Sequence, residues 1–245
     1  MSVADRISTW IAEQVRLAEA KGAVLGLSGG VDSSLAAVLA KRALGDRVLG
    51  LLMPCHSDPQ DMAHAQWVAE TFHIRTELVD LTLVFDAFLA VLPVAVPPQG
   101  DRLAQANLKA RLRMATLYYH ANLHNYLVVG TSNRSELAVG YFSKFGDGGA
   151  DILPLGGLLK GQVRELAREV GIPQPIIEKP PSGGLWPGQT DEGEMGITYR
   201  EIDEALQALE TGEPHRVPAE ALAQVQRMMD HSAHKRAMPP ICPLP

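Results

Sequence analysis

The amino-acid sequence predicts a doubly wound α/β fold, in which helices cover both faces of a mostly parallel sheet. Short apolar runs alternate with longer stretches of helical periodicity through the first half of the chain, which is the pattern of a buried parallel sheet. With 245 residues, 46% of them hydrophobic and 20% charged, the chain has ordinary globular composition and enough length for a large core. No repeat or linker divides the sequence, so we expect residues 1–245 to form a single domain.

The regular elements of the first half follow from these periodicities. The first is an amphipathic helix near the N-terminus, with Ile7, Trp10, Ile11 and Val15 facing inward. Apolar runs bounded by glycine, proline or polar residues predict strands at 23–28, 47–54, 74–81 and 125–131. Helical spacing between and after these runs predicts helices at 32–44, 59–72, 82–92 and 103–124.

The second half is rich in glycine and proline. One clear helix is expected in "LLKGQVRELAREVG". It ends at Gly171, with Pro173 just beyond, which is a normal stop signal. Two further helices are expected at 198–210 and 218–236. Long loops near 94–101 and 180–195 are expected to be functional, poorly ordered without ligands and able to close over a bound intermediate.

Charge and cysteine content exclude several classes of partner and compartment. A net charge of -6 argues against a nucleic-acid partner, because binding to that backbone depends on clustered lysine and arginine. The first twenty residues carry charges among their apolar positions, so they fit neither a signal peptide nor a membrane span. Cys55 and Cys242 lie far apart without metal-ligand spacing, which predicts reduced thiols in a cytoplasmic protein.

The stretch "VLGLSGGVDSSLAA", residues 24–37, carries the main chemical signal. A strand, a glycine turn and a helix start aim backbone N–H groups and the positive helix end at an anion. The loop lacks the lysine of a Walker A motif and places Asp32 where an anion would bind. A carboxylate beside polyphosphate is tolerable when Mg²⁺ lies between them, so Asp32 is a candidate magnesium ligand. Capping of the following helix by Asp32 is the alternative.

Two levels of resemblance narrow the function. "SGGVDS" resembles the signature loop of the ATP pyrophosphatases, which implies cleavage of ATP between its α and β phosphates and a five-stranded adenine-nucleotide hydrolase-like sheet. Further segments, in the right order, resemble the NAD synthetase family. These are "NLKARLRM" (107–114), "VVGTSNRSE" (128–136), "FSKFGDGGADILPL" (142–155), "KPPSGGLWPGQTDEGEMGI" (179–197) and "HKR" (234–236).

The resemblance implies an ATP site and a magnesium site. The implied ATP-binding residues are Gly26, Leu27, Ser28, Gly29, Gly30, Val31, Asp32, Ser33, Thr131, Lys160 and Ser182. Asp32 and Glu136 are the implied magnesium ligands, and Lys160 is the implied phosphate-binding cation. An exposed glutamate in a first helical turn and a lysine on a helix surface are the alternatives for Glu136 and Lys160. Ser182 stands where the family commonly has threonine, and the hydroxyl is retained.

The resemblance also implies a site for deamido-NAD. Its residues are Asn107, Arg111, Lys144, Asp147, Asp151, Glu194, His234 and Lys235. Asn107 and Arg111 lie four residues apart and share a helix face, whereas Lys109 and Arg113 are better explained by a solvated face. Asp147, with Asp32 and Lys160, is a candidate catalytic residue, because it could accept a proton from ammonium near the reacting carboxyl group. An ordinary Asp-Gly turn is the alternative for Asp147.

The function implied is ATP-dependent amidation of deamido-NAD with ammonia, through an adenylylated intermediate, to give NAD, AMP and pyrophosphate. The chain has no room for the amidohydrolase domain of a glutamine-dependent enzyme, but a separate glutaminase subunit stays open as the source of nitrogen. Another ATP pyrophosphatase and a non-catalytic nucleotide binder are the remaining alternatives. The resemblance also implies a homodimer, with which the apolar stripe of helix 103–124 is compatible, although core packing explains that stripe equally well.

Overall fold

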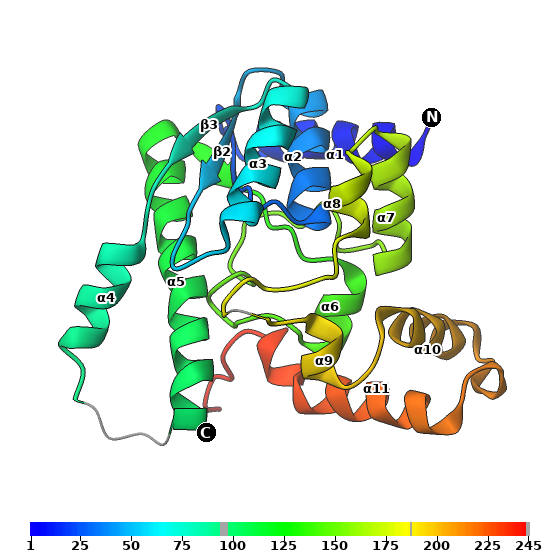
Figure 1. Ribbon diagram of the computed structural model, residues 1–245. Coiled ribbons are helices and arrows are strands. Elements are labelled where there is room, and N and C mark those ends of the chain that lie inside the picture. The colour runs from blue at the N-terminus through cyan, green and yellow to red at the C-terminus, as the bar shows by residue number, and fades with distance from the viewer. Residues whose placement is uncertain (94–97, 187, 244–245) are drawn as a thin grey trace.

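A computed structural model describes residues 1–93, 98–186 and 188–243 and contains one parallel sheet. Its strands are β1 (Gly22–Gly26), β2 (Val48–Leu52), β3 (Arg75–Leu78) and β4 (Tyr126–Val128), in the spatial order β3-β2-β1-β4 (Figure 1). All three strand pairs are parallel. The α/β class and the four strands located in the sequence are therefore confirmed, although each strand is shorter than its apolar run.

Helices and short turns of helix connect and extend the sheet. In chain order they are α1 (Val3–Leu17), α2 (Val31–Leu44), α3 (Pro59–Thr71), α4 (Thr82–Ala90), α5 (Pro98–His124), α6 (Arg134–Val139), α7 (Lys160–Glu169), α8 (Gln174–Glu178), α9 (Asp191–Met195), α10 (Tyr199–Thr211), η1 (Pro214–Arg216), α11 (Ala219–His231) and η2 (Ala233–Lys235). The short helices α6, α8 and α9 have no counterpart among the helices that the sequence predicts.

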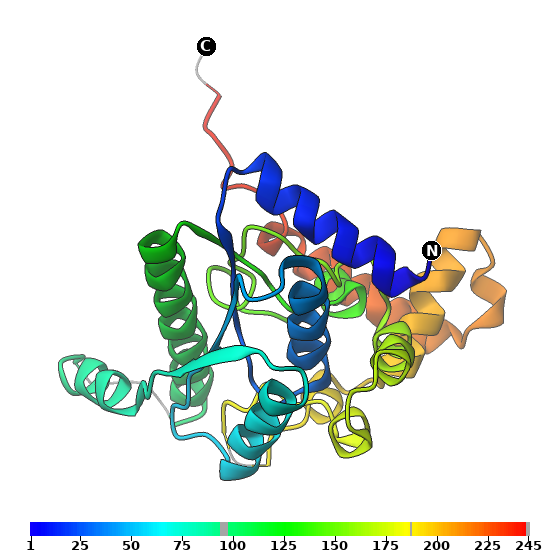
Figure 2. The same ribbon diagram turned by 90° about the horizontal axis from the view of Figure 1, so that it is seen from above.

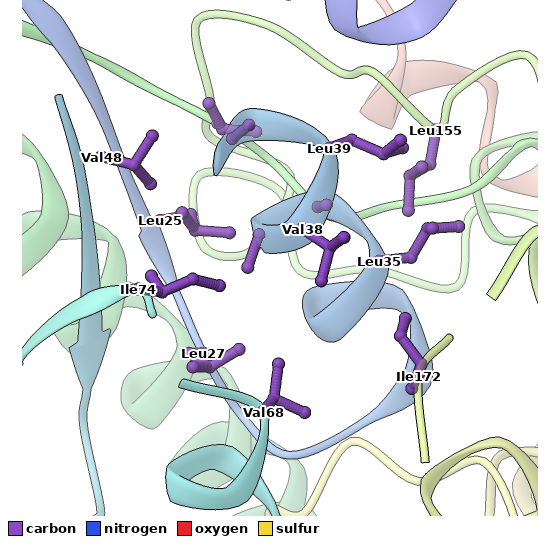
Figure 3. Close-up of a cluster of buried hydrophobic side chains, with 14 of the residues drawn as sticks. Leu25, Leu27, Leu35, Val38, Leu39, Val48, Val68, Ile74, Leu155 and Ile172 are labelled. Atoms are coloured by element: carbon purple, nitrogen blue, oxygen red, sulfur yellow. The ribbon is translucent and has the colours of Figure 1, made fainter. Parts of the chain in front are cut away.

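The two faces of the sheet are covered by different helices, as expected. Along β1 the side chains alternate: Ala23, Leu25 and Leu27 pack with α2, α3 and α7, whereas Val24 belongs to a second cluster with residues of α5. Figure 3 shows Leu25 and Leu27 on one side of α2, and Leu35 and Leu39 extending from its other side toward Leu155 and Ile172. Seen from above, α5 and α2 lie on opposite sides of the strands (Figure 2).

The predicted inward face of α1 is correct except at one residue. Ile11 and Val15 are buried, whereas Trp10 is 39% exposed. The buried positions are Ala4, Ser8, Ile11 and Val15, spaced by four, three and four residues. Trp10 lies about 100° from Ile11 around the helix axis, on the side away from Ser8 and Val15, and is therefore outside the buried stripe.

The expectation of a fifth strand is wrong for the described residues. In place of a strand, Ile152 forms an isolated parallel bridge with Val129 beyond the end of β4. Pro154 follows two residues later and has no amide hydrogen to donate, so the ladder cannot extend along this segment. The polypeptide passes beside β4 without continuing as a strand.

The strand order identifies where a ligand would bind. From β1 the chain moves to β2 and β3 on one side and then returns to place β4 on the other side of β1. This reversal is a topological switch point, and ligands of open α/β sheets bind outside the carboxyl ends of the strands at such a point. The segments that leave β1 and β4 there are residues 27–33 and 129–136.

The last third of the chain packs as a separate layer against α6 and α7. Buried residues of α10 and α11, with Val139 of α6, form their own hydrophobic cluster. The predicted helix at 218–236 is shorter than expected, because α11 ends at His231 and a turn of 3-10 helix follows at Ala233–Lys235. At that point the hydroxyl of Ser232 donates to the carbonyl of Met228 at 2.7 Å and occupies an acceptor of the last helical turn.

Two expectations concern membranes and loops. None of the helices in the described ranges is long and apolar enough to cross a membrane. Residues 94–97, part of the first expected loop, lie outside the described residues, whereas residues 98–101 form the first turn of α5 and not a loop. In the second expected loop, residues 191–195 form the short helix α9.

The burial of β1 gives a prediction for folding stability. Leu25 is fully buried between the sheet and α2, so Leu25→Ala should lower the free energy of unfolding by about 2–5 kcal/mol. Urea denaturation followed by circular dichroism would measure the change. Leu78→Ala is a suitable control, because Leu78 is 65% exposed on edge strand β3 and its truncation should change stability by less than about 1 kcal/mol. Equal losses in the two variants would contradict this description of the core.

Candidate active site

The glycine turn after β1 is fixed by close contact with α3. Gly29 has φ of +79°, and a Cβ at this position would lie 2.2 Å from the carbonyl oxygen of Asp61. Only glycine fits both the left-handed conformation and this approach. The hydroxyls of Ser28 and Ser33 lie 2.9 Å apart, and Ser33 donates to the carbonyl of Gly30 at 3.0 Å. These bonds hold the loop in a fixed shape at the N-terminal end of α2.

The side chains in the predicted ATP loop differ in what they could offer a nucleotide. Leu27 and Val31 are buried, with Leu27 in the core cluster beneath the loop, so their backbone is the part that a ligand could reach. Gly30 is the N-cap residue of α2, and no side chain of this N-cap residue caps the backbone N–H groups of the first helical turn. The helix start therefore retains donors for an anion.

Asp32 does not cap α2. Its carboxylate accepts a hydrogen bond from the Nδ2 of Asn133 at 2.8 Å and lies 2.5 Å from the Nζ of Lys160. The same ammonium lies 3.0 Å from Oε1 of Glu136. The structure thus brings together Asp32, Glu136 and Lys160, which lie on α2, α6 and α7, and the capping alternative for Asp32 is wrong.

Lys160 and Glu136 are inside the protein rather than on helix surfaces. The side chain of Lys160 is 3% exposed and that of Glu136 is 14% exposed, so the surface alternatives for both are wrong. Glu136 is also the third residue of a capping box, in which Asn133 and Glu136 exchange hydrogen bonds at the start of α6. This box fixes the backbone that presents Glu136 to Lys160.

Burial and charge set the protonation of this ion-pair cluster. Burial raises the pKa of Glu136, and the charge of Asp32 raises it further, against the lowering effect of Lys160; the result is a pKa of about 7. For Lys160, burial lowers the pKa, but the charges of Asp32 and Glu136 more than offset this effect and raise it above the ordinary value. The ammonium therefore stays charged and the two carboxylates compete for it.

A second layer of acidic and phenolic groups adjoins the cluster. The hydroxyl of Tyr199 lies 3.2 Å from Oε1 of Glu136 and 2.9 Å from Oδ2 of Asp191. The hydroxyl of Tyr141 lies 3.1 Å from Oδ1 of Asp191 and 2.7 Å from Oε2 of Glu194. Sequence reasoning identified only Glu194 here, because nothing in the local pattern distinguishes these tyrosines and Asp191 from core and loop residues.

Most of the predicted substrate residues form a separate cluster around the start of the 142–155 segment. Asn107 hydrogen-bonds with Ser143, and a guanidinium nitrogen of Arg111 donates to the carbonyl of Lys144 at 3.4 Å. The ammonium of Lys144 donates to the carbonyl of His234 at 2.5 Å. Ser143 and Lys144 thus connect α5 to the residues around His234, which are about ninety residues further along the chain.

Lys235 and Asp147 complete this cluster. Lys235 donates to the carbonyls of Gly140 and Phe142 at 2.8 and 2.9 Å. Asp147 accepts a hydrogen bond from the backbone N–H of Ser143 at 2.9 Å. Burial lowers the pKa of Lys235, and the negative charge of Asp147 offsets part of this effect. Asp147 therefore forms the local turn that the sequence offered as an alternative, and its exposed side chain is also accessible.

The other predicted site residues, Thr131, Ser182 and Asp151, each have a separate set of neighbours. Thr131 is half-buried in the segment after β4, and exposed Ser182 accepts the backbone N–H of Gly184 at 3.1 Å. Asp151 accepts hydrogen bonds from the backbone of Val128 at 2.7 Å and from Tyr118 at 3.0 Å. Within the described ranges, no hydrogen bond connects Asp151 to the other predicted substrate residues.

The interpretation of Lys109 and Arg113 as a solvated helix face is wrong. Lys109 is 7% exposed, and its ammonium donates to the carbonyl of Leu185 at 2.9 Å. Arg113 donates to the carbonyl of Met53 at 3.1 Å and to the hydroxyl of Ser57 at 3.2 Å. Their spacing on α5 from Asn107 and Arg111 places them on another side of the helix, and that side faces the sheet and the 180–195 segment.

The fold and this site define an α/β nucleotide-binding enzyme, with a glycine loop, two carboxylates and a buried lysine at the switch point of a parallel sheet. A family model described as NAD synthase matches residues 3–239. The chain therefore belongs to the NAD synthase family, and it is an ATP-using ligase of NAD biosynthesis, as its sequence predicts.

Individual relatives agree with this assignment. The NH(3)-dependent NAD(+) synthetase of Carboxydothermus hydrogenoformans is 47% identical over 237 residues, which cover 97% of this chain and 95% of the relative. The protein of the same name from Methanocaldococcus jannaschii is 46% identical, with 97% and 95% covered.

Solved structures are similar over the whole chain. The NMN synthetase of Francisella tularensis has a TM-score of 0.90 at 38% identity, with 99% of this chain and 98% of that chain covered. The NH3-dependent NAD synthetase of Campylobacter jejuni, solved with a nitrate ion, has a TM-score of 0.84 at 31% identity, with 99% and 100% covered. A glutamine-dependent NAD+ synthetase from Acinetobacter baumannii shares the fold at 23% identity, but the match covers only 46% of that chain.

The buried cluster gives a prediction about stability and pH. Lys160→Met leaves the carboxylates of Asp32 and Glu136 without a counter-charge, so we expect a loss of about 3–5 kcal/mol in unfolding free energy near pH 8. Because the folded-state pKa of Glu136, about 7, already exceeds its ordinary value of 4.5, stability falls as pH rises through this window. Removing the ammonium raises that pKa further, so the loss should be smallest near about pH 5.

Urea unfolding at several pH values would measure this effect. Lys41→Met is the matched control, because Lys41 forms an ion pair with fully exposed Asp46 and should show no comparable pH dependence. A loss for Lys160→Met that is the same at every pH would contradict the ion-pair cluster.

Proposed function

We propose that this protein catalyses the ATP-dependent amidation of deamido-NAD with ammonia, giving NAD, AMP and pyrophosphate. The observation that carries the proposal is the convergence of Asp32, Glu136 and Lys160 beside the glycine loop, in a chain of the NAD synthase family. A single assay of NAD formation from deamido-NAD, ATP and ammonium tests it. Absence of NAD formation by the folded protein would refute it.

ATP binds, in this proposal, with its phosphates at the start of α2. Backbone N–H groups of the glycine loop and the positive end of α2 favour the anion. Lys160 supplies the cation that the loop lacks, and the hydroxyls of Ser28 and Ser33 supply further donors. Thr131 leaves β4 at the adjacent strand end, where the adenosine part of the nucleotide lies, and Ser182 approaches from the 180–195 segment.

The residues present fit a magnesium ion. Asp32 and Glu136 offer carboxylate oxygens that share contact with one ammonium, so they converge on one position. Among the described residues no group of three or more potential metal-binding side chains occurs, which agrees with the preference of Mg²⁺ for one or two carboxylates together with substrate phosphates. When bound, the ion would neutralise the departing pyrophosphate. Burial raises the pKa of Glu136, and a bound cation would favour its charged form.

Deamido-NAD binds, in this proposal, along α5 and the chain end. Asn107 and Arg111 present an amide and a guanidinium from one helix face, and Lys144, His234 and Lys235 surround the adjoining segment. Four of these groups can be cationic, which suits a ligand with two phosphates and a carboxylate. Glu194 and Asp151 belong to the same proposed site, at its edges.

The nicotinate carboxylate is a weak electrophile, so it must be activated before ammonia can attack it. The nicotinate carboxylate attacks the α phosphorus, the bond to pyrophosphate breaks, and a mixed anhydride with AMP forms. Ammonia then attacks the activated carbonyl and expels AMP, while Asp147 accepts the proton from ammonium. Water would hydrolyse the anhydride, so the segment near 180–195 closes over it in this proposal. Lys109 supports this segment through its bond to Leu185.

Ammonia is proposed as the direct nitrogen source. The ammonia-dependent relatives match this chain over nearly their full length, whereas it spans about half of the glutamine-dependent structures. Supplying ¹⁵N-labelled ammonium or amide-labelled glutamine to the purified protein separates the two donors. Efficient transfer from glutamine without another subunit would defeat the assignment, and transfer only after addition of a glutaminase would identify a two-subunit system.

Amidation of nicotinate mononucleotide is a second candidate. The structural match to an NMN synthetase, with a TM-score of 0.90, favours it. The amidation assay with the mononucleotide in place of deamido-NAD decides between them. A higher kcat/KM for the mononucleotide would reassign the substrate without changing the reaction.

We further propose that the protein is a cytoplasmic homodimer. The buried side chains of α5, including Ala106, Ala110 and Ala121, explain part of its apolar stripe as core. Exposed apolar side chains remain on α5 and on neighbouring α4, among them Tyr119, Leu123 and Leu83. Sedimentation equilibrium tests the dimer, and a monomer at assay concentration would refute it.

Both cysteines are free, which is consistent with a reducing compartment.

Asp32→Asn tests the catalytic role of the loop carboxylate. The amide cannot serve as an anionic metal ligand, so pyrophosphate release that depends on deamido-NAD should fall by about a hundredfold or more. Nucleotide binding should be partly kept, because the glycine loop and helix start are unchanged. Asp46→Asn, at an exposed position, is the control and should retain full activity. Normal turnover of Asp32→Asn would refute the metal role.

A further inference from the structure

Tyr199 contacts both partners of the buried ion pair, although it belongs to another layer of the structure. It is 2% exposed at the start of α10. Its hydroxyl lies 3.2 Å from Oε1 of Glu136, the same oxygen that Lys160 contacts. The Nζ of Lys160 lies over the Tyr199 ring, 4.7 Å from its centroid, which is a favourable cation–π position. The phenol thus restrains the ammonium from one side and the carboxylate from another.

Asp203 restrains the backbone that carries the same pair. Its Oδ2 accepts the backbone N–H of Gly161 at 2.8 Å, and its other oxygen accepts the hydroxyl of Ser135. The Ser135 hydroxyl in turn accepts the backbone N–H of Lys160 at 3.0 Å. A carboxylate here also complements the positive end of α7. Asp203 therefore joins the first turns of α6 and α7 at the residues next to Glu136 and Lys160.

Tyr199 and Asp203 are one helical turn apart and share a face of α10. The rest of α10 is anchored elsewhere: Ile202, Ala205 and Leu206 are buried in the cluster formed with α6 and α11. Figure 1 shows α10 below α6 and α7, apart from the sheet. Neither residue belongs to the predicted ATP, metal or substrate sites, so their contacts with the ion pair have another role.

We propose that Tyr199 and Asp203 are positioning residues, through which α10 holds Lys160 and Glu136 in the geometry that MgATP requires. This inference rests on the proposed function. Lysine has a long, flexible side chain, and its ammonium can donate in three directions. Side-chain contacts from Tyr199 and backbone contacts from Asp203 together restrict those directions. Since a misplacement of about 1 Å can reduce a rate by on the order of a hundredfold, loss of either restraint should be visible in catalysis.

Three variants test the proposal. Tyr199→Phe removes the hydroxyl and keeps the ring beneath the ammonium. Asp203→Ala removes both hydrogen-bond acceptors, and Asp203→Asn restores one acceptor oxygen, so it should partly rescue the loss. Ile202→Val is the matched control, because it truncates a fully buried side chain of the same helix that has no polar atom to bond with the ion-pair cluster.

Two measurements separate positioning from a purely structural role. Isothermal titration calorimetry with MgATP alone should show affinity about tenfold weaker in Tyr199→Phe and Asp203→Ala, with no change in Ile202→Val. In the amidation assay, kcat should fall by about ten- to a hundredfold, whereas KM for deamido-NAD should change less than about threefold, because the substrate cluster on α5 is separate. Thermal unfolding confirms that every variant is folded at the assay temperature.

The outcomes distinguish this proposal from the proposed function. MgATP affinity and kcat equal to those of Ile202→Val would overturn the positioning role. An unaltered protein that binds MgATP but forms no NAD would refute the function alone, and weaker MgATP binding in the two variants would still support positioning. A fall in kcat that Asp203→Asn does not rescue at all, with MgATP binding intact, would overturn the role of Asp203.

Discussion

The arrangement of the site depends on one interaction: the ammonium of Lys160 held between the carboxylates of Asp32 and Glu136. Two carboxylates cannot share a buried position without a cation, because burial removes the water that would otherwise screen them. Lysine provides that cation in the structure described here. In the proposed function, a second cation between the carboxylates leaves the same ammonium available to a triphosphate, so one lysine suits both states of the proposed site.

The fold brings this interaction about through its strand order. Because β4 returns to the open side of β1, the loop with Asp32 and the helix with Glu136 leave neighbouring strands at the same edge. Gly29 lets the first of these loops approach α3, where any side chain would collide with Asp61. Asn133 then bonds to Asp32 while capping the helix of Glu136. Backbone conformation and side-chain contacts therefore bring Asp32 and Glu136 to the same position.

The local sequence pattern predicts part of the fold and of the candidate site, but not all of either. The four strands and the glycine loop could be predicted from apolar runs and a recognisable motif. The family resemblance assigned Asp32, Glu136 and Lys160 to one site, and the structure brings these three side chains together. The fifth strand could not be rejected, since Pro154 prevents the ladder only by its place beside β4. Tyr199 and Asp203 gave no signal, because a buried helix residue looks the same in sequence whether it packs on a core or on an ion pair. Lys109 was wrongly predicted to lie on a solvated helix face for the same reason.

The Tyr199 hydroxyl lies between two carboxyl groups whose pKa values burial raises. The Tyr199 hydroxyl carries one proton but lies within hydrogen-bond distance of both Glu136 and Asp191. Both contacts can be hydrogen bonds only when one carboxyl group is itself protonated. Burial raises the pKa of Glu136 and of Asp191, which favours that state. Asp191 also begins α9 and its backbone N–H donates to Pro181 at 2.9 Å. The end of the 180–195 segment is thus bonded, through one phenol, to the carboxylate that Lys160 contacts.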